Sequence, residues 1–130
     1  MESVPDYTLT IPDTPPSDNK FSGPRGRFAK SDAVEGFGWE IWGAMNDVDC
    51  PCDIASRRKV RVQITFPKPA RRDQANFCKV LQDAMKFARL IVDDSPKWLD
   101  FELPTLRYVR GVRETKIEVW EVGDDKGLGI

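Results

Sequence analysis

The most regular pattern in this sequence is the alternation of apolar and polar side chains over residues 58–66, RKVRVQITF. Val60, Val62, Ile64 and Phe66 recur at every second position, which is the period of a strand with one buried face. Such a strand must bury its apolar face against a second layer of structure. This requirement constrains the fold more than any other feature of the chain.

A helical pattern follows this strand. From about Asp73 to Leu90 the apolar residues gather on one arc at ~100° per residue; they are Phe77, Val80, Leu81, Ala84, Ala88 and Ile91. Asn76, Lys79 and Asp83 fall on the neighbouring arc and form a polar stripe beside the buried face. We therefore predict a helix here whose apolar arc faces the core.

Weaker patterns on both sides predict further elements. We expect a short strand at Tyr7–Pro12, a loop rich in Gly and Arg at 21–30, and a connecting loop around Cys50 and Cys52. A helix is expected from Ser31, with one face formed by Val34, Phe37, Ile41, Trp42 and Met45. Extended segments are expected at 98–103, 105–111 and 115–122, the last with Ile117 and Val119 on one side and Trp120 on the other.

The length of 130 residues suits one domain with a single core. We predict an α/β or α+β fold with helices packed on one mixed sheet, residues 7–122 ordered and the tail 123–130 frayed. No apolar run approaches the roughly 20 residues that cross a bilayer, and the N-terminus lacks the pattern of a secretory signal. We expect a cytoplasmic protein without a membrane partner.

The chain has three cysteines and no histidine. An odd number of cysteines argues against a disulfide framework, and a closed four-ligand zinc site would need carboxylates beside Cys50 and Cys52. Without histidine, any acid–base chemistry must use carboxylates, lysine or metal-activated water.

The net charge is only −1, but the basic residues are clustered. No acid lies between Asp53 and Asp73, a window that contains Arg57, Arg58, Lys59, Arg61, Lys68, Arg71 and Arg72. A second acid-free stretch contains Lys20, Arg25, Arg27 and Lys30. On charge alone a solvated face is the favoured interpretation, and a nucleic-acid surface is the alternative.

Acids bracket the helix predicted after this window. Asp73 stands at its start and Asp93 and Asp94 follow its end. A helix cap and a turn are the ordinary roles of such residues. Carboxylates that a returning loop brings together would also suit a hard divalent cation such as Mg²⁺. Both interpretations stay open.

Basic residues beside these acids would suit a phosphodiester substrate. Arg71 and Arg72 would hold backbone phosphates. Lys79 would reach the scissile phosphate, or would form a salt bridge with Asp83 four residues further on. The sequence leaves these two roles of Lys79 equally open.

These residues resemble the RusA-type crossover-junction endodeoxyribonucleases, many of which are carried by phages and prophages. The resemblance extends from about Tyr7 to Val122 and rests on PPSDNK (15–20), RRDQANFCKVLQDAMKFARLIVDDS (71–95) and VRGVRETKIEVWEV (109–122). It implies a homodimer that binds four-way (Holliday) DNA junctions and uses Mg²⁺, or Mn²⁺ in its place, to cut two strands symmetrically. The implied setting is the cytoplasm of a bacterium or a phage-infected host.

The resemblance also implies roles for individual residues. Asp73 and Asp94 correspond to metal-ligating acids and Lys79 to an essential active-site lysine. Asp83 and Asp93 are further candidate ligands. The implied DNA-binding residues are Arg71, Arg72, Lys20 and Asn76.

Ala75 departs from this family pattern, because the best-known members have a second acid at this position. Another acid, Asp83 or Asp93, would then complete the metal site. The alternative is a catalytically impaired or non-catalytic junction-binding protein on the same scaffold. A protein-interaction module with no nucleic-acid role is a third possibility, which explains the basic window before Asp73 poorly.

Overall fold

A computed structural model describes residues 3–17, 26–52 and 56–122, with the backbone alone for residues 26–29. The expected frayed tail 123–130 lies outside the described residues. Within them the chain forms a mixed five-stranded sheet and two α-helices, which confirms the predicted mixed α+β fold. The elements are β1 (Tyr7–Ile11), α1 (Gly26–Asp47), β2 (Arg58–Phe66), the 3₁₀ helix η2 (Gln74–Phe77), α2 (Cys78–Phe87), β3 (Leu99–Phe101), β4 (Thr105–Tyr108) and β5 (Glu114–Glu121).

The strand β2 is the centre of the sheet. It pairs antiparallel with β5, and β5 pairs antiparallel with β1. On its other side β2 pairs parallel with β3 through its first residues and with β4 through its last. Since parallel strands need a crossover, η2 and α2 connect β2 to this edge.

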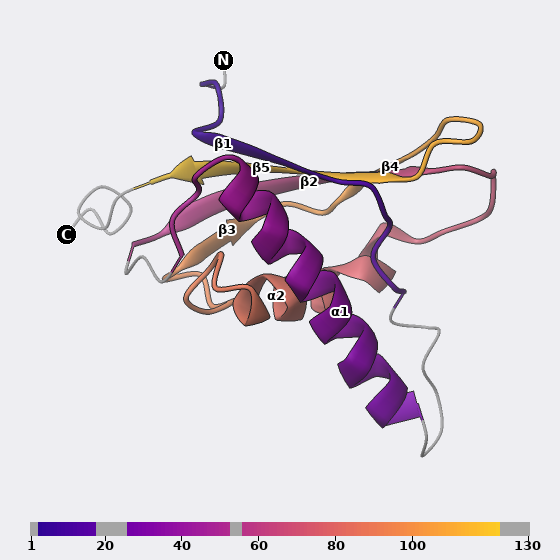
Figure 1. The fold of residues 1–130 in the computed structure, drawn as a ribbon, viewed down its shortest axis with the longest axis horizontal. Coiled ribbons are helices and arrows are strands. Elements are labelled where there is room, and N and C mark those ends of the chain that lie inside the picture. Colours follow the sequence, from indigo (N-terminus) through magenta and orange to yellow (C-terminus); the bar gives the residue numbers. More distant parts are fainter. Residues whose placement is uncertain (1–2, 18–25, 53–55, 123–130) are drawn as a thin grey trace.

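Both helices lie on the same face of the sheet (Figure 1). Val60, Val62 and Ile64 of β2 are fully buried beneath them, which confirms the predicted inner face of this strand. On the outer face Trp120 lies 5.4 Å from Lys59 Nζ and 5.2 Å from Arg61 Cζ, measured to the ring centroid. The domain therefore has two layers, with the core between the helices and one face of the sheet.

The apolar arc predicted for the second helix is buried in full. The helix itself is shorter than predicted, because α2 ends at Phe87 instead of Leu90. Arg89 has a positive φ of 64°, and the Leu90 N–H donates to the Met85 carbonyl at 2.9 Å. This is the bonding pattern of a Schellman cap, usually made by glycine. Because arginine rarely occupies this left-handed position, the helix end at Phe87 could not be predicted from the sequence.

The first helix is longer than predicted. It begins at Gly26, before the expected start at Ser31, and so includes the end of the segment predicted as a loop. Val34, Phe37, Ile41 and Met45 are buried as expected. Trp42 is 43% exposed, and its predicted place in the core was wrong. It follows Ile41 directly and is therefore turned about 100° away from the buried face.

The strand predictions were largely correct, with small differences at the ends. The segment 58–66 is a strand over its whole predicted length, and β1 ends one residue earlier than expected. The two segments after α2 form only short strands, β3 and β4. In the part of the chain that the structure describes, no helix could cross a membrane.

Candidate functional site

Asp73 is the N-cap of η2. Its backbone is extended (φ −102°, ψ 127°), and its carboxylate oxygen accepts a hydrogen bond from the Ala75 N–H at 3.0 Å. The side chain thus satisfies one of the free amides at the start of the helix. The capping role left open by the sequence is confirmed, and it places this exposed carboxylate directly after Arg71 and Arg72.

Lys79 joins two of the predicted site acids. Its Nζ lies 3.0 Å from Asp83 Oδ1, one turn further along α2, and 3.8 Å from Asp94 Oδ2, in the loop after the helix. The salt bridge between Lys79 and Asp83 is confirmed, and the loop does return to the helix. The lysine side chain is 57% exposed, so this pairing lies at the surface, where ion pairs are weak.

Lys86 extends the same cluster, and it was missed at the level of sequence. Its Nζ lies 3.8 Å from Asp93 Oδ1 and 3.8 Å from Asp94 Oδ2. The Asp94 backbone N–H lowers the pKa of Asp93, with further contributions from the Ser95 side chain and the Lys86 charge. Lys86 stands three residues after Asp83 in a helix, so its position on this flank could have been predicted.

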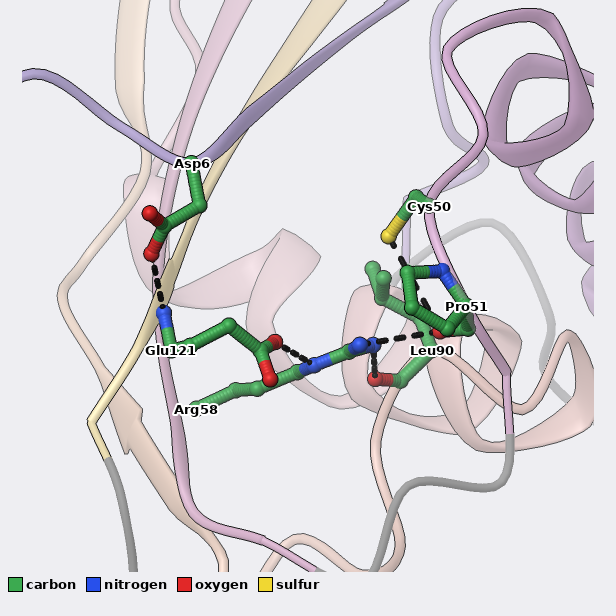
Figure 2. Close-up of polar contacts among 6 residues, drawn as sticks. All are labelled: Asp6, Cys50, Pro51, Arg58, Leu90 and Glu121. Carbon is green, nitrogen blue, oxygen red and sulfur yellow. Dashed lines mark hydrogen bonds and ion pairs between the residues drawn. The ribbon is translucent and has the colours of Figure 1, made fainter.

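Arg58 holds the segment that leads to this cluster. Figure 2 shows its guanidinium between three chain segments: Nη1 donates to the Leu90 carbonyl at 2.6 Å, Nη2 to the Pro51 carbonyl at 2.9 Å, and Nε pairs with Glu121. The side chain is 1% exposed. Because Leu90 begins the loop that carries Asp93 and Asp94, Arg58 helps to fix where that loop lies.

The basic window therefore has two parts with different roles. Arg58 and Arg61 at its start pair with Glu121 and Glu118 of β5, so their charges are compensated within the fold. Arg71 at its end is exposed, and the Arg72 guanidinium lies 3.8 Å from the centroid of the Phe66 ring. The arginines expected to bind DNA are thus at the surface beside Asp73.

The structure says less about two further predicted site residues, Asn76 and Lys20. Asn76 is partly buried in η2, where its backbone N–H donates to the Asp73 carbonyl at 3.0 Å. Lys20, with the rest of the DNK part of the PPSDNK segment (18–20), lies outside the described residues.

The carboxylates fit Mg²⁺ in part. Within the described ranges no group of three or more Asp, Glu, Cys or His side chains is arranged to hold a metal ion. Asp83, Asp93 and Asp94 share a site with two ammonium groups, whereas Asp73 bonds to its own helix start. Mg²⁺ is commonly held by one or two carboxylates, with water and substrate phosphate as the other ligands. Asp94 with Asp83 or Asp93 could supply the carboxylates of such an open site, whereas none of the contacts found in the described ranges joins Asp73 to them.

Comparison of the sequence with models of known protein families finds no match, and a search of curated proteins finds none either. The described fold is a small α+β domain with a lysine–aspartate cluster on α2 and the loop that follows it.

Proposed function

We propose that this protein is a Mg²⁺-dependent, structure-selective endonuclease of the RusA type, which resolves four-way DNA junctions by symmetric phosphodiester hydrolysis. One observation carries the proposal: Lys79 pairs with both Asp83 and Asp94. Lys79 and Asp83 come from α2, and Asp94 comes from the loop beyond it. Their convergence is what a shared site for phosphate chemistry requires.

Each residue of the site has a role in this proposal. Asp94 and Asp73 would hold Mg²⁺, with Asp83 or Asp93 as a further ligand. The chemistry that Mg²⁺ supplies when bound is polarisation of the phosphate and activation of the attacking water. Lys79 would leave its aspartate partners and balance the negative charge that develops on the phosphate oxygens. Its exposed side chain allows this movement.

Substrate positioning would come from the surface in front of Asp73. Arg71 and Arg72 would hold phosphates that flank the scissile bond, and Lys20 would add a further contact. Contacts to phosphate orient DNA without selecting bases, so weak sequence preference is expected. A homodimer would present two such sites to the two-fold symmetry of a junction.

The proposal is tested by a cleavage assay on a labelled synthetic four-way junction with and without Mg²⁺. We expect two symmetric cuts that require the metal. Asp94→Asn should lower the rate by roughly 100-fold or more, because even partners of metal ligands contribute about 10- to 100-fold. Asp47→Asn, an exposed acid at the end of α1, is the matched control and should leave the rate unchanged.

The second candidate is a non-catalytic junction-binding protein, which Ala75 favours. Tight and salt-dependent binding of the junction, with no product at any Mg²⁺ concentration, would establish this alternative and refute the nuclease. Absence of salt-dependent DNA binding would refute both candidates and favour a protein-interaction module.

A further inference from the structure

Two basic segments that are far apart in the sequence meet at one end of the sheet. Residues 67–72 contain Lys68, Arg71 and Arg72, and residues 103–113 contain Arg107, Arg110 and Arg113; neither segment contains an acid. The parallel pairing of β2 with β4 sets Phe66 opposite Tyr108. Beyond it, Val109 N–H donates to the Phe66 carbonyl at 3.1 Å and Gly111 N–H to the Pro67 carbonyl at 3.3 Å. Figure 1 shows the turn after β4 and the segment after β2 leaving the sheet at this end.

A shallow groove of about 230 Å³ lies between these segments, and we call it the β2–β4 groove. Phe66, Arg72, Leu106, Arg107 and Tyr108 line it, with Pro69 and Ala70. Two of its lining side chains are guanidinium groups and none is an acid. The groove is smaller than the roughly 300–1,000 Å³ of pockets that enclose a drug-sized ligand. Its size suits one planar group of a ligand, while the rest of that ligand stays outside the groove.

Both guanidinium groups are held in place. Arg107 Nε donates to Thr65 Oγ1 at 2.8 Å, across the β2–β4 pair. Arg72 Nη1 donates to the Lys68 carbonyl at 3.2 Å while its Cζ lies over the Phe66 ring. Fixed guanidinium groups bind phosphate oxygens with little loss of side-chain freedom.

Tyr108 adds an aromatic surface to this positive site. Its side chain is 48% exposed at the edge of the groove. An exposed aromatic ring next to arginines is the combination that binds unpaired nucleotides, since bases stack on the ring and phosphates contact the cations. An acidic peptide would use the charges and gain nothing from the ring.

We propose that the β2–β4 groove binds an unstacked nucleotide of branched or single-stranded DNA, with Arg72 and Arg107 at the phosphate and Tyr108 stacked on the base. The inference deepens the proposed function, on which it rests for the choice of DNA. At the crossover of a four-way junction the strands pass from one helix to another, so nucleotides there unstack more easily than those inside an uninterrupted duplex. The groove would therefore distinguish a junction from uninterrupted duplex, whose bases are stacked and paired.

Binding of the full chain to fluorescently labelled oligothymidine, measured by anisotropy in EDTA, tests this site. We expect Tyr108→Ala to weaken binding roughly 5- to 150-fold with an unchanged salt dependence, because stacking is lost and no cation is removed. Tyr108→Phe, which keeps the ring, should bind as the natural protein does. Trp39→Ala removes another exposed aromatic ring, outside the groove, and is the control.

Arg107→Ala tests the phosphate contact separately. The slope of log affinity against log salt should fall by about 0.7, the value for one phosphate contact to a single strand. Lys97→Ala, an exposed base outside the groove, should leave the slope unchanged. Thermal unfolding of each variant checks that the fold is retained.

Three results would overturn the site: an unchanged affinity of Tyr108→Ala, an equal loss in Tyr108→Phe, or displacement of the oligonucleotide by polyglutamate as effectively as by DNA. Because the assay contains no metal, it is independent of cleavage. If the protein binds oligothymidine through Tyr108 but cuts no junction, the nucleotide-binding role of the groove stands and the proposed nuclease activity is refuted.

Discussion

At the scale of single residues, Arg58 has the most buried charge in the described part of the chain. It connects the loop before β2, the loop after α2 and the strand β5, through Pro51, Leu90 and Glu121. Arg61, three positions along the same strand, also pairs with a glutamate of β5 but is 36% exposed. The two arginines have similar partners. Arg58 is expected to contribute more to stability, because its side chain is buried and that of Arg61 is partly exposed.

Arg58→Met should lower the free energy of unfolding by roughly 3–5 kcal/mol, because breaking a buried pair leaves its partners without compensation. Arg61→Met should lower it by less than about 1 kcal/mol, as expected for a pair near the surface. Urea unfolding followed by circular dichroism measures both values. Equal losses in the two variants would contradict the structural role assigned to Arg58.

Ala75 is the second residue whose identity matters for the proposed metal site. Its N–H donates to the Asp73 carboxylate, and its side chain lacks the carboxylate expected at this position. If the metal site lacks a ligand, Ala75→Asp should lower the Mg²⁺ concentration needed for half-maximal cleavage. Ala75→Asn, of nearly the same size and without the charge, should not. A Mg²⁺ titration with the same half-maximal concentration in all three proteins would mean that another acid already serves as the ligand.

At the scale of elements, the packing of α1 on α2 depends on one glycine. A Cβ on Gly38 would lie 2.5 Å from Phe87 Cδ1 and 3.2 Å from the Ala84 carbonyl oxygen. By contrast, a Cβ on Gly36 would meet nothing within 4 Å. Both residues lie inside the same helix, where glycine is costly compared with alanine. The helices can approach closely only because position 38 has no side chain.

Gly38→Ala should therefore destabilise the protein by about 1 kcal/mol or more, since overpacking outweighs the gain in helix propensity. Gly36→Ala should stabilise it by about 0.5–1 kcal/mol. Thermal unfolding midpoints of the two variants provide the comparison. A shift to higher temperature in both would show that Phe87, which is 39% exposed, moves aside at little cost.

At the scale of the whole molecule, a net charge of −1 hides an uneven distribution. Lysine–aspartate pairs surround the end of α2, and acid-free arginine segments meet at the end of β2 and β4. The proposed function requires these surfaces to contact DNA in two copies, because one domain offers a single such site. Symmetric cutting then depends on a two-fold arrangement of subunits.

We expect sedimentation velocity to give a species of twice the 14.8 kDa chain mass at concentrations where junctions are cut. The two strands should be cut at symmetry-related positions, since each subunit would serve one strand. Asp94→Asn, which changes a surface acid, should sediment as the natural protein does. A monomer under cleavage conditions would contradict the proposed dimer. The nuclease activity itself would then still be tested by the cleavage assay.

The sequence by itself determined the elements whose signals are local. Apolar residues at every second position fixed β2, and an apolar arc at the helical period fixed the buried face of α2. The mixed sheet with helices on it followed from these elements. Local spacing also predicted the Lys79–Asp83 pair, because residues four apart in a helix are neighbours.

The tertiary structure alone decided the features that depend on which distant segments meet. It ended α2 at a left-handed Arg89, buried Arg58 within a basic window, and brought Asp94 back to Lys79. It also placed Arg107 and Tyr108 beside Arg72, through the pairing of β4 with β2. Sequence patterns report which face of an element is apolar. Partners across the fold are chosen by packing and strand pairing, which no local period encodes.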